Sequence, residues 1–323
     1  MPLPPATEKP PNRTLLHAVA RMHYAEDLPQ IEIARRLDLS AATVSRLLKR
    51  AREEGIVRIE VRAPDTTEDL ARALQTRLGL KRAGVVAAPE AMALTALAGP
   101  VGTMLREAAL PPGSILALGW GRAVRAVIAA GLPPVPGLVT VPMTGGMQQA
   151  AAHFQINEFV RMAAEQTGGT PHFIHAPSLP SAESRAAFLT DATIRDHIAL
   201  WDRIDLALVG IGLPHRIDPV HAAAATSGEL ALAHAAGDVL RHYFDADGRL
   251  IPWEGDERLI AVSVAQIRRI PLVIGLAAAP AKAGAIIGAV RAGLLNALVT
   301  DADTAEAILI KLETTELARQ ARG

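Results

Sequence analysis

Residues 30–61, QIEIARRLDLSAATVSRLLKRAREEGIVRIEV, contain the pattern that decides the fold of the N-terminal region. QIEIARRL places its apolar residues on one face of a short helix, and a second amphipathic segment, AATVSRLLKRAREEG, begins after Ser40. The Ser40 hydroxyl can accept a hydrogen bond from an unpaired first-turn amide, and a glycine such as Gly55 commonly ends a helix. With Asp38 and Leu39 as a tight connection, the stretch predicts two helices joined by a turn.

The flanking residues extend the same unit. In TLLHAVARMHYAED, residues 14–27, apolar side chains recur every three to four positions, which predicts a first helix that ends before Leu28 and Pro29. IVRIEVR, residues 56–62, alternates apolar and charged residues and predicts a short strand. Ala-Pro-Asp at 63–65 indicates a hinge.

The second helix of the pair carries hydroxyl and basic side chains, and a DNA major groove admits such a helix. Residues in its first turns can reach bases, whereas Arg50 and Arg52 suit phosphates, which supply affinity without sequence information. A solvated basic face is the alternative reading, but the three-helix spacing, the turn and the cap together favour DNA binding. Arg35 and Arg36 fit either a backbone contact or plain surface. The predicted DNA-binding residues are Ser40, Thr43, Ser45, Arg46, Lys49, Arg50 and Arg52.

Composition restricts the class of protein. A length of 323 residues suits a small domain plus a larger one, and the absence of Cys excludes a disulfide scaffold, a thiolate zinc site and a cysteine nucleophile. No stretch reaches the roughly 18 apolar residues that a membrane span needs, so we expect a cytoplasmic protein without a membrane partner. Residues 13–62 hold 10 Lys and Arg against 7 Asp and Glu, a weak indication of a polyanionic partner.

The remainder of the chain predicts an α/β fold. A helical segment at 65–80 follows the hinge and suits a linking or dimerising role, and short apolar runs rich in Val, Ile and Leu then alternate with helical patterns. Such runs are typical of strands buried on both faces of a parallel sheet flanked by helices, a doubly wound arrangement. The runs are 83–88, 114–120, 137–143, 205–212, 259–264, 271–277 and 297–301.

Three of these runs end in glycine turns: GWGRAV at 119–124, Gly145-Gly146, and Gly210 to Gly212. Because ligands of open α/β sheets bind beyond the carboxyl ends of the strands, the three turns could converge on a ligand, with helix-start amides facing an anion. Lys282 follows another strand and could pair with a phosphate or a carboxylate. Ordinary loops and an exposed lysine remain the alternatives.

The stretch at 30–61, together with GWGRAV, VPMTGGM, LALVGIG and AKAGAIIGAVRAGLLNALVTDADTA, resembles the SorC-type (sugar-binding) bacterial transcriptional regulators from about residue 14 to 313. The resemblance implies a C-terminal domain like the ribose-5-phosphate isomerase and glucosamine-6-phosphate deaminase fold, which binds a sugar or sugar-phosphate effector. It also implies a homo-oligomer, either a dimer or a tetramer, on double-stranded operator DNA. The effector-binding residues that it implies are Gly119, Trp120, Gly121, Arg122, Ala123, Thr144, Gly145, Gly146, Asn157, Gly210, Ile211, Gly212, Asp238 and Lys282.

Three departures from the family pattern limit this carry-over. Ala41 and Ala42 begin the recognition helix where similar proteins often have larger polar residues. Thr144 is uncharged where some sugar-phosphate-binding relatives have a cation, and Ala278-Ala279 stand where glycines are usual. On sequence, Arg122 could supply the missing charge or form a surface ion pair, and Asn157 could hold a sugar hydroxyl or cap a helix.

The predicted organisation is a disordered tail at 1–12, a helix-turn-helix DNA-binding domain at 13–63, and an effector-binding and oligomerisation domain at 64–323. We expect a regulator rather than an enzyme, with no metal and no cofactor. A sugar-phosphate isomerase or deaminase with an appended DNA-binding segment is the alternative, and a constitutive DNA-binding protein with an assembly domain is another. We interpret the candidates for acid/base or metal chemistry, His172, His175, His215, Asp218 and His221, as loop or surface residues.

Overall fold

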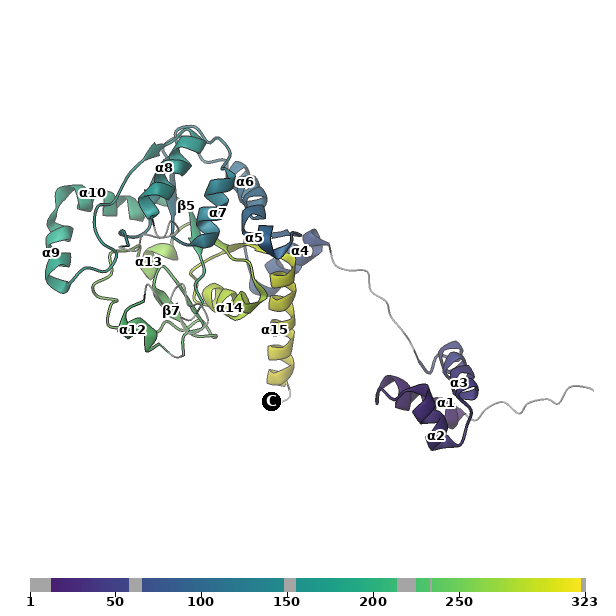
Figure 1. Ribbon diagram of the computed structural model, residues 1–323. Coiled ribbons are helices and arrows are strands. Elements are labelled where there is room, and N and C mark those ends of the chain that lie inside the picture. The colour runs from purple at the N-terminus through teal and green to yellow at the C-terminus, as the bar shows by residue number, and fades with distance from the viewer. Residues whose placement is uncertain (1–12, 58–65, 148–154, 214–224, 233, 321–323) are drawn as a thin grey trace, which may run out of the picture. The chain divides into compact units, whose positions relative to one another are not determined.

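The computed structural model divides into two compact units, 1–64 and 65–323 (Figure 1). The predicted tail at 1–12, the hinge at 63–65 and most of the predicted strand at 56–62 lie outside the described residues, and Ile56 and Val57 form a bend. The structure describes residues 13–57, 66–147, 155–213, 225–232 and 234–320.

The N-terminal unit contains α1 (Arg13–Tyr24), α2 (Gln30–Leu37) and α3 (Ala41–Glu53), as the spacing predicts. Asp38 ends α2 in the left-handed region at φ 54°, which turns the chain sharply into Leu39 and Ser40. The helices enclose one small apolar core formed by Leu16, Val19, Ala20, Ile33, Ala34, Val44, Leu47, Leu48 and Ala51. This core fixes α3 against the other two helices and leaves its opposite face to solvent.

The second unit is built on a seven-stranded parallel sheet of order β1-β9-β8-β5-β2-β3-β4. The fold class predicted from the apolar runs is therefore confirmed. The strands are β1 (Arg82–Val86), β2 (Ile115–Leu118), β3 (Val139–Pro142), β4 (Thr170–Pro171), β5 (Ile204–Gly210), β8 (Leu272–Leu276) and β9 (Ala297–Asp301).

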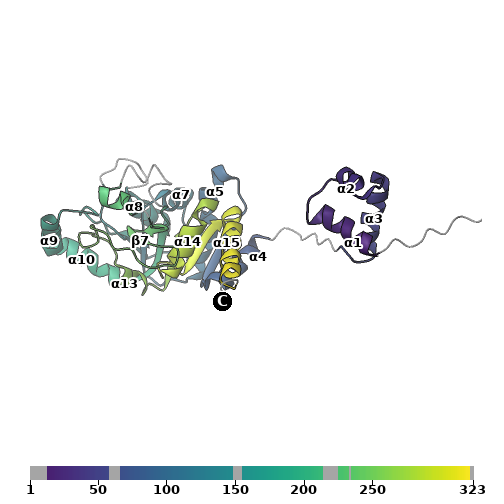
Figure 2. The same cartoon turned by 90° about the horizontal axis from the view of Figure 1, so that it is seen from below.

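Alternate strand residues enter two different cores. Ile115 and Ala117 of β2 join the cluster that contains residues of α4, α14 and α15, whereas Leu116 and Leu118 join the cluster of α6, α7 and α8. Helices thus cover both faces of the sheet (Figure 2), which explains why its strands read as continuous apolar runs. The helices are α4 (Thr67–Leu78), α5 (Glu90–Ala96), α6 (Ala98–Glu107), α7 (Arg122–Ala130), α8 (Ile156–Thr167), α9 (Ala182–Thr190), α10 (Ala192–Leu200), α12 (Ser227–Leu230), α13 (Val264–Ile267), α14 (Ala283–Arg291) and α15 (Ala302–Gln320), with 3-10 turns η2 (Trp201–Arg203) and η3 (Pro280–Lys282).

The strand predicted at 259–264 is wrong. Within it only Ala261 forms a bridge, to Thr144, and the chain then turns into α13. The Ser263 side chain accepts a hydrogen bond from the Gln266 amide, and the Gln266 side chain accepts one from the Ser263 amide. This capping box starts a helix where the apolar pattern alone indicates a strand.

A two-stranded antiparallel hairpin, β6 (Gly237–Val239) and β7 (His242–Phe244), forms a second sheet, and Asp238 of β6 bridges to Gly212 just beyond β5. Its two turn residues, Leu240 and Arg241, have φ values of 54° and 65°. Positive φ at both central positions is the geometry of a two-residue hairpin turn that normally takes Asn and Gly. The sequence analysis did not predict this hairpin.

Candidate functional site

Helix α3 presents one apolar face and one polar face. The buried face consists of Val44, Leu47, Leu48 and Ala51. Of the residues predicted to bind DNA, Ser40, Ser45, Arg46, Lys49 and Arg52 are exposed, whereas Thr43 and Arg50 are half-buried. The structure therefore brings the predicted set together on the solvent side of one helix.

The start of α3 is fixed by its cap. Ser40 has extended backbone geometry, and its Oγ accepts a hydrogen bond of 3.1 Å from the Thr43 amide and lies 2.8 Å from the Thr43 Oγ1. Arg46 reaches back to the same Thr43 Oγ1 at 3.5 Å. The cap thus orients the first polar side chains of the helix as well as starting it.

Two basic side chains further along α3 pair with glutamates at the end of the helix and just after it. Lys49 lies 3.8 Å from Glu53, and Arg50 lies 2.7 Å from Glu54. Exposed pairs of this kind contribute little to stability, typically below about 1 kcal/mol. A phosphate could therefore replace these glutamates as partner at small cost.

We expect Ser40→Ala to destabilise α3 by about 1 kcal/mol, because the Thr43 amide loses its hydrogen-bond acceptor. Hydrogen exchange of the α3 amides in the full-length protein measures this change as roughly a fivefold loss of protection. Ser45→Ala is the matched control, since it removes the same hydroxyl inside the helix, where Ala is the better helix former. Equal exchange rates in both variants would contradict the capping role.

The second unit contains a cavity of about 450 Å³ at the carboxyl ends of its central strands. Residues that directly follow β2, β5 and β8 contribute to it, as the strand-end rule predicts. Nine predicted effector residues line it: Trp120, Gly121, Arg122, Ala123, Gly210, Ile211, Gly212, Asp238 and Lys282. The lining residues that the sequence analysis missed are Glu90, Ala93, Leu94, Leu213, Leu240, Leu276, Ala278, Ala279, Pro280, Asp301 and Asp303.

Gly119 lies just outside the lining. Its amide donates a 2.8 Å hydrogen bond to the Leu208 carbonyl and so continues the pairing of β2 with β5. A Cβ on Gly119 would lie 3.2 Å from the Leu240 side chain, which does face the cavity. This glycine therefore supports the wall rather than lining it.

Thr144, Gly145 and Gly146 do not line this cavity. Thr144 is buried and donates to the Ile260 carbonyl at 3.2 Å, and a Cβ on Gly145 would lie 2.6 Å from the Ala176 carbonyl oxygen. The close approach of these backbones accounts for the glycine. Their effector role stays a prediction.

Asn157 is also separate from the cavity. Its Nδ2 donates to the Ile174 carbonyl at 3.0 Å, and its Oδ1 accepts from the Ile174 amide at 3.3 Å. This reciprocal pair ties α8 to the segment after β4. The sugar contact that the family resemblance implies for Asn157 stays a prediction.

Lys282 and Asp238 provide opposite charges in the cavity. Lys282, in η3, donates from Nζ to the Ile211 carbonyl at 2.6 Å. Asp238 is buried, and its backbone pairs with that of Gly212 through an amide-to-carbonyl hydrogen bond of 2.9 Å. A Cβ on Gly212 would lie 1.9 Å from the Asp238 Oδ1, so the glycine is required by this approach.

Ala279 occupies an unusual backbone conformation in the cavity wall, with φ 140° and ψ 129°. Residues other than glycine rarely adopt such values, because this backbone conformation costs them about 1–3 kcal/mol. The Ala279 amide donates to the Thr304 Oγ1 at 2.8 Å, and Thr304 donates in turn to the buried Asp301 carboxylate. These contacts hold the loop after β8 against the start of α15.

We expect Ala279→Gly to raise the free energy of unfolding by about 1 kcal/mol, because glycine removes the conformational strain. Urea denaturation of the full-length protein, followed by tryptophan fluorescence, measures the change. Ala278→Gly is the matched control: Ala278 has a negative φ, so glycine there should lower the free energy of unfolding. A decrease for Ala279→Gly would contradict the strain assignment.

The cavity combines apolar and ionic walls. Four acidic residues, Glu90, Asp238, Asp301 and Asp303, and two basic ones, Arg122 and Lys282, line it beside several leucines and Trp120. Such a mixture of hydrogen-bonding groups and apolar surface suits a small polyhydroxylated ligand. Helix α7 also begins at Arg122, directly after Gly121, so its first amides lie beside the cavity.

Of the histidines considered for metal binding, His172 and His175 are exposed in the segment after β4, whereas the nearby His197 was not among the candidates. His197 is buried, and burial lowers its pKa to about 4, with His172 and His175 adding a smaller effect in the same direction. Its Nε2 lies 3.5 Å from the Pro142 carbonyl. Among the described residues no group of three His, Cys, Asp or Glu side chains could hold a metal ion. His215, Asp218 and His221 lie outside the described residues.

Comparison with known proteins places these features in a family. The family model described as "Putative sugar-binding domain" matches residues 63–310, and a MarR family model matches residues 9–66. The sorbitol operon regulator of Klebsiella pneumoniae is 32% identical over 309 residues, covering 91% of this chain and 97% of that protein. The crystal structure of that full-length regulator superposes with a TM-score of 0.69 over 92% of this chain and 98% of that chain.

This chain belongs to the SorC family of transcriptional regulators. Other members are similar over most of its length: the deoxyribonucleoside regulator of Bacillus subtilis is 27% identical over 90% of this chain and 95% of that protein. The structure of a probable sor operon regulator from Shigella flexneri matches at TM-score 0.70 and 29% identity, over 76% of this chain and all of that chain. These relatives are named regulators, and they give no support to the enzyme alternative.

Membership of the SorC family confirms the predicted pairing of a helix-turn-helix unit with a sugar-binding domain. Among the described residues no helix is both long and apolar enough to cross a membrane.

Proposed function

We propose that this SorC-family regulator binds its operator through α3 and that a sugar or sugar phosphate in the 450 Å³ cavity changes operator affinity. The observation that carries the proposal is the convergence of Asp238, Lys282 and the turn at Trp120 to Ala123 on one cavity at the strand ends. Hydroxyl groups suit the carboxylates, and an anionic group suits Lys282, Arg122 and the first amides of α7.

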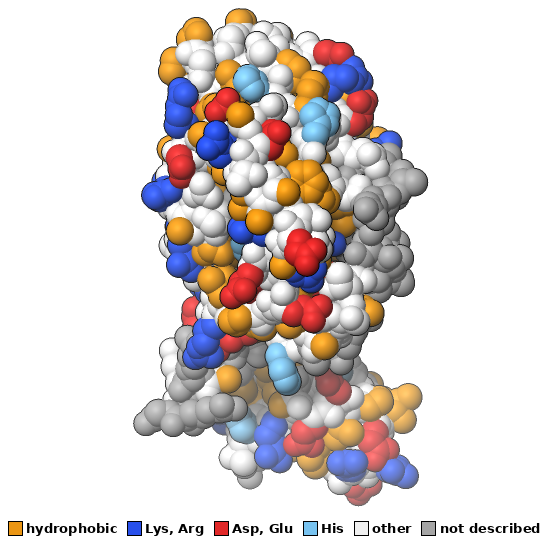
Figure 3. All heavy atoms as spheres, turned by 90° about the vertical axis from the view of Figure 1, so that its left-hand side faces the viewer, with side chains coloured by type: hydrophobic (Ala, Val, Ile, Leu, Met, Phe, Trp, Pro, Cys, Tyr) orange, Lys and Arg blue, Asp and Glu red, His pale blue; other side chains and the backbone are white. Residues whose placement is uncertain are grey.

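One face of the second unit differs in charge from the exposed side of α3. Acidic and basic side chains are interspersed over the face drawn in Figure 3, which includes α9 and α10. Interspersed charges produce no strong field of one sign, whereas phosphate binding needs a basic surface. The exposed basic side chains of α3 provide one.

The experiment that tests the function is fluorescence anisotropy on labelled DNA from upstream of the protein's own operon, at fixed salt. The titration is repeated with D-sorbitol, D-sorbitol 6-phosphate, D-ribose 5-phosphate and 2-deoxy-D-ribose 5-phosphate. A compound that shifts a sequence-specific curve supports the proposal and distinguishes a phosphorylated effector from a neutral one. Tight operator binding that no sugar or sugar phosphate moves would overturn the effector half of the proposal.

We also propose that the regulator works as a cytoplasmic homo-oligomer, a dimer or a tetramer. Helix-turn-helix proteins commonly read paired half-sites as symmetric assemblies. The long helix α15 exposes Ile310 and Leu317, seven residues apart on one side of the helix, as apolar surface suited to self-association. Sedimentation equilibrium of the full-length protein measures the assembly, and a monomer at micromolar concentration would overturn this part.

A further inference from the structure

The turn of the β6–β7 hairpin has a backbone conformation that its sequence does not explain. Leu240 and Arg241 both adopt left-handed backbone geometry without being Gly or Asn, which costs free energy at each position. Leu240 lines the cavity, whereas Arg241 is buried and does not. Something outside the turn must therefore hold it in this conformation.

Arg241 is held by a buried carboxylate. Its Nε lies 3.3 Å from the Glu229 Oε1, and the two side chains are only 8% and 1% exposed. The Tyr243 hydroxyl donates to the same oxygen at 2.7 Å, and burial raises the pKa of Tyr243 above its usual value, which keeps this donor protonated. The Glu229 Oε2 accepts from the Thr226 amide at 2.8 Å in the capping box of α12.

The same arginine is connected to the cavity through its backbone. The Arg241 amide donates to the Asp238 Oδ2 at 3.1 Å, and the Asp238 backbone pairs with that of Gly212, which also lines the cavity. A chain of contacts thus runs from Glu229 through Arg241 to the Asp238 carboxylate. Buried ion pairs seldom give a net gain in stability over apolar residues of similar size. We therefore look for a role of this pair other than stabilising the fold.

We propose that Glu229 and Arg241 are positioning residues of the effector pocket, whose buried ion pair holds the strained turn so that Asp238 and Leu240 face the ligand. This inference rests on the proposed function, because it takes the cavity as the effector site. Neither residue lines the cavity, so both act through Asp238 and Leu240.

Three variants of the full-length protein distinguish a positioning role in effector binding from a purely structural role: Glu229→Gln, Arg241→Met and the double variant. Each single variant leaves one buried polar group poorly compensated and should lower Tm, whereas the double variant removes both charges and should recover most of it. Affinity for the active compound among D-sorbitol, D-sorbitol 6-phosphate and the two pentose phosphates should fall at least 10-fold in all three. Operator binding without effector should stay within twofold of wild type.

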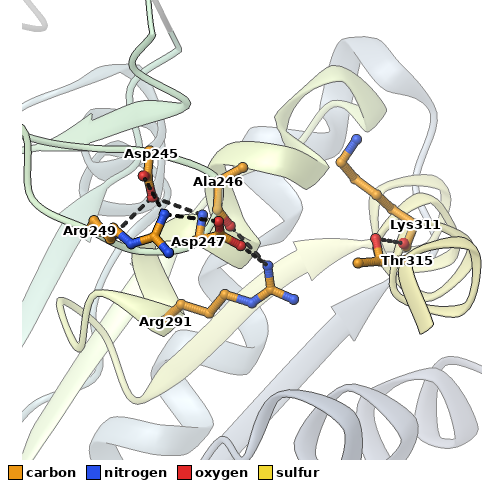
Figure 4. Close-up of polar contacts among 7 residues, drawn as sticks. All are labelled: Asp245, Ala246, Asp247, Arg249, Arg291, Lys311 and Thr315. Atoms are coloured by element: carbon orange, nitrogen blue, oxygen red, sulfur yellow. Dashed lines mark hydrogen bonds and ion pairs between the residues drawn. The ribbon is translucent and has the colours of Figure 1, made fainter. Parts of the chain in front are cut away.

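An exposed ion pair after the same hairpin provides the control (Figure 4). Asp247 lies 3.3 Å from Arg249 and 3.9 Å from Arg291, and Arg291 also reaches the Ala246 carbonyl at 2.9 Å. Asp247→Asn makes the same acid-to-amide change as Glu229→Gln, but at a half-exposed side chain. It should change neither Tm nor effector affinity appreciably.

Recovery of effector affinity together with Tm in the double variant would show a merely structural role and overturn the proposal. Hydrogen exchange without any ligand gives a second, independent readout: the amides of Gly212 and Arg241 should exchange at least 10-fold faster in the double variant, while those of β8 and β9 stay unchanged. If no sugar or sugar phosphate acts on wild type, the proposed function fails. Hydrogen exchange alone then tests the positioning role, and a wild-type exchange rate of the Arg241 amide in the double variant would refute that role.

Discussion

Lys282→Met should lose about 10- to 100-fold in effector affinity while it binds operator DNA as tightly as wild type. Lys282 lines the cavity, and its Nζ donates to the carbonyl of Ile211, another lining residue, at 2.6 Å, so that it can also donate to a ligand oxygen there. A hydrogen bond from a charged donor contributes about 1.5–3 kcal/mol, which corresponds to this range of affinity. Methionine keeps the apolar stem and removes only the charge and the donors.

The matched control for this variant is Lys81→Met. Lys81 also donates from Nζ to a backbone carbonyl, that of Pro271, at 2.8 Å, but it immediately precedes β1 and does not line the cavity. Anisotropy with a fixed operator and a titrated effector compares the two variants. Unchanged effector response in Lys282→Met would show that this lysine has no ligand role, and equal losses in both variants would indicate a general loss of stability.

Arg46→Ala should weaken binding to the operator by about 1–3 kcal/mol, the usual contribution of a good base contact. Arg46 is exposed one turn into α3, and its guanidinium reaches the Oγ1 of Thr43, the residue whose amide Ser40 caps. The start of the helix therefore orients this side chain. If it reads a base, the variant should bind random DNA almost as wild type does. Titrations against operator and random duplexes at one salt concentration measure both affinities.

Two further variants complete the DNA test. Arg21→Ala is the control, because Arg21 is an exposed arginine of the same unit that pairs with Glu26 at 3.3 Å, outside the predicted set. Arg52→Ala should weaken operator and random DNA alike and reduce the slope of log affinity against log salt by about 1, as expected for a phosphate contact. Equal losses on both duplexes for Arg46→Ala would mean that Arg46 contacts phosphate rather than a base.

The sequence predicts well those elements whose local signals agree with their packing. Helix α3 follows from Ser40 and the spacing of Val44, Leu47 and Leu48, and the structure confirms both the cap and the buried face. The central strands follow from apolar runs, because a sheet covered on both faces selects continuous hydrophobic residues. Cavity residues directly after β2 and β5 follow from the strand-end rule.

Other parts of the pocket could not be predicted from local pattern. The β6–β7 turn carries Leu240 and Arg241 where turn chemistry calls for Asn and Gly, because tertiary contacts rather than local preference hold it. Among the cavity residues that the sequence analysis missed, Asp301 could have been predicted, since ALVTD places a carboxylate at the end of an apolar run. Glu90 and Asp303 lie in the first turns of α5 and α15, where acidic residues are common for helix stability alone.

The order of strands in the sheet has a consequence for synthesis and folding. Among the strands that the structure describes, β1 pairs with β9 alone, so the first strand of the second unit joins the sheet through the last one. A nascent chain must therefore keep β1 apart from the sheet until nearly all of its residues have left the ribosome, and long-range pairing of this kind is slow. A truncated product that ends before Ala297 would expose the apolar edge of β8, where it could recruit strands from other chains and aggregate.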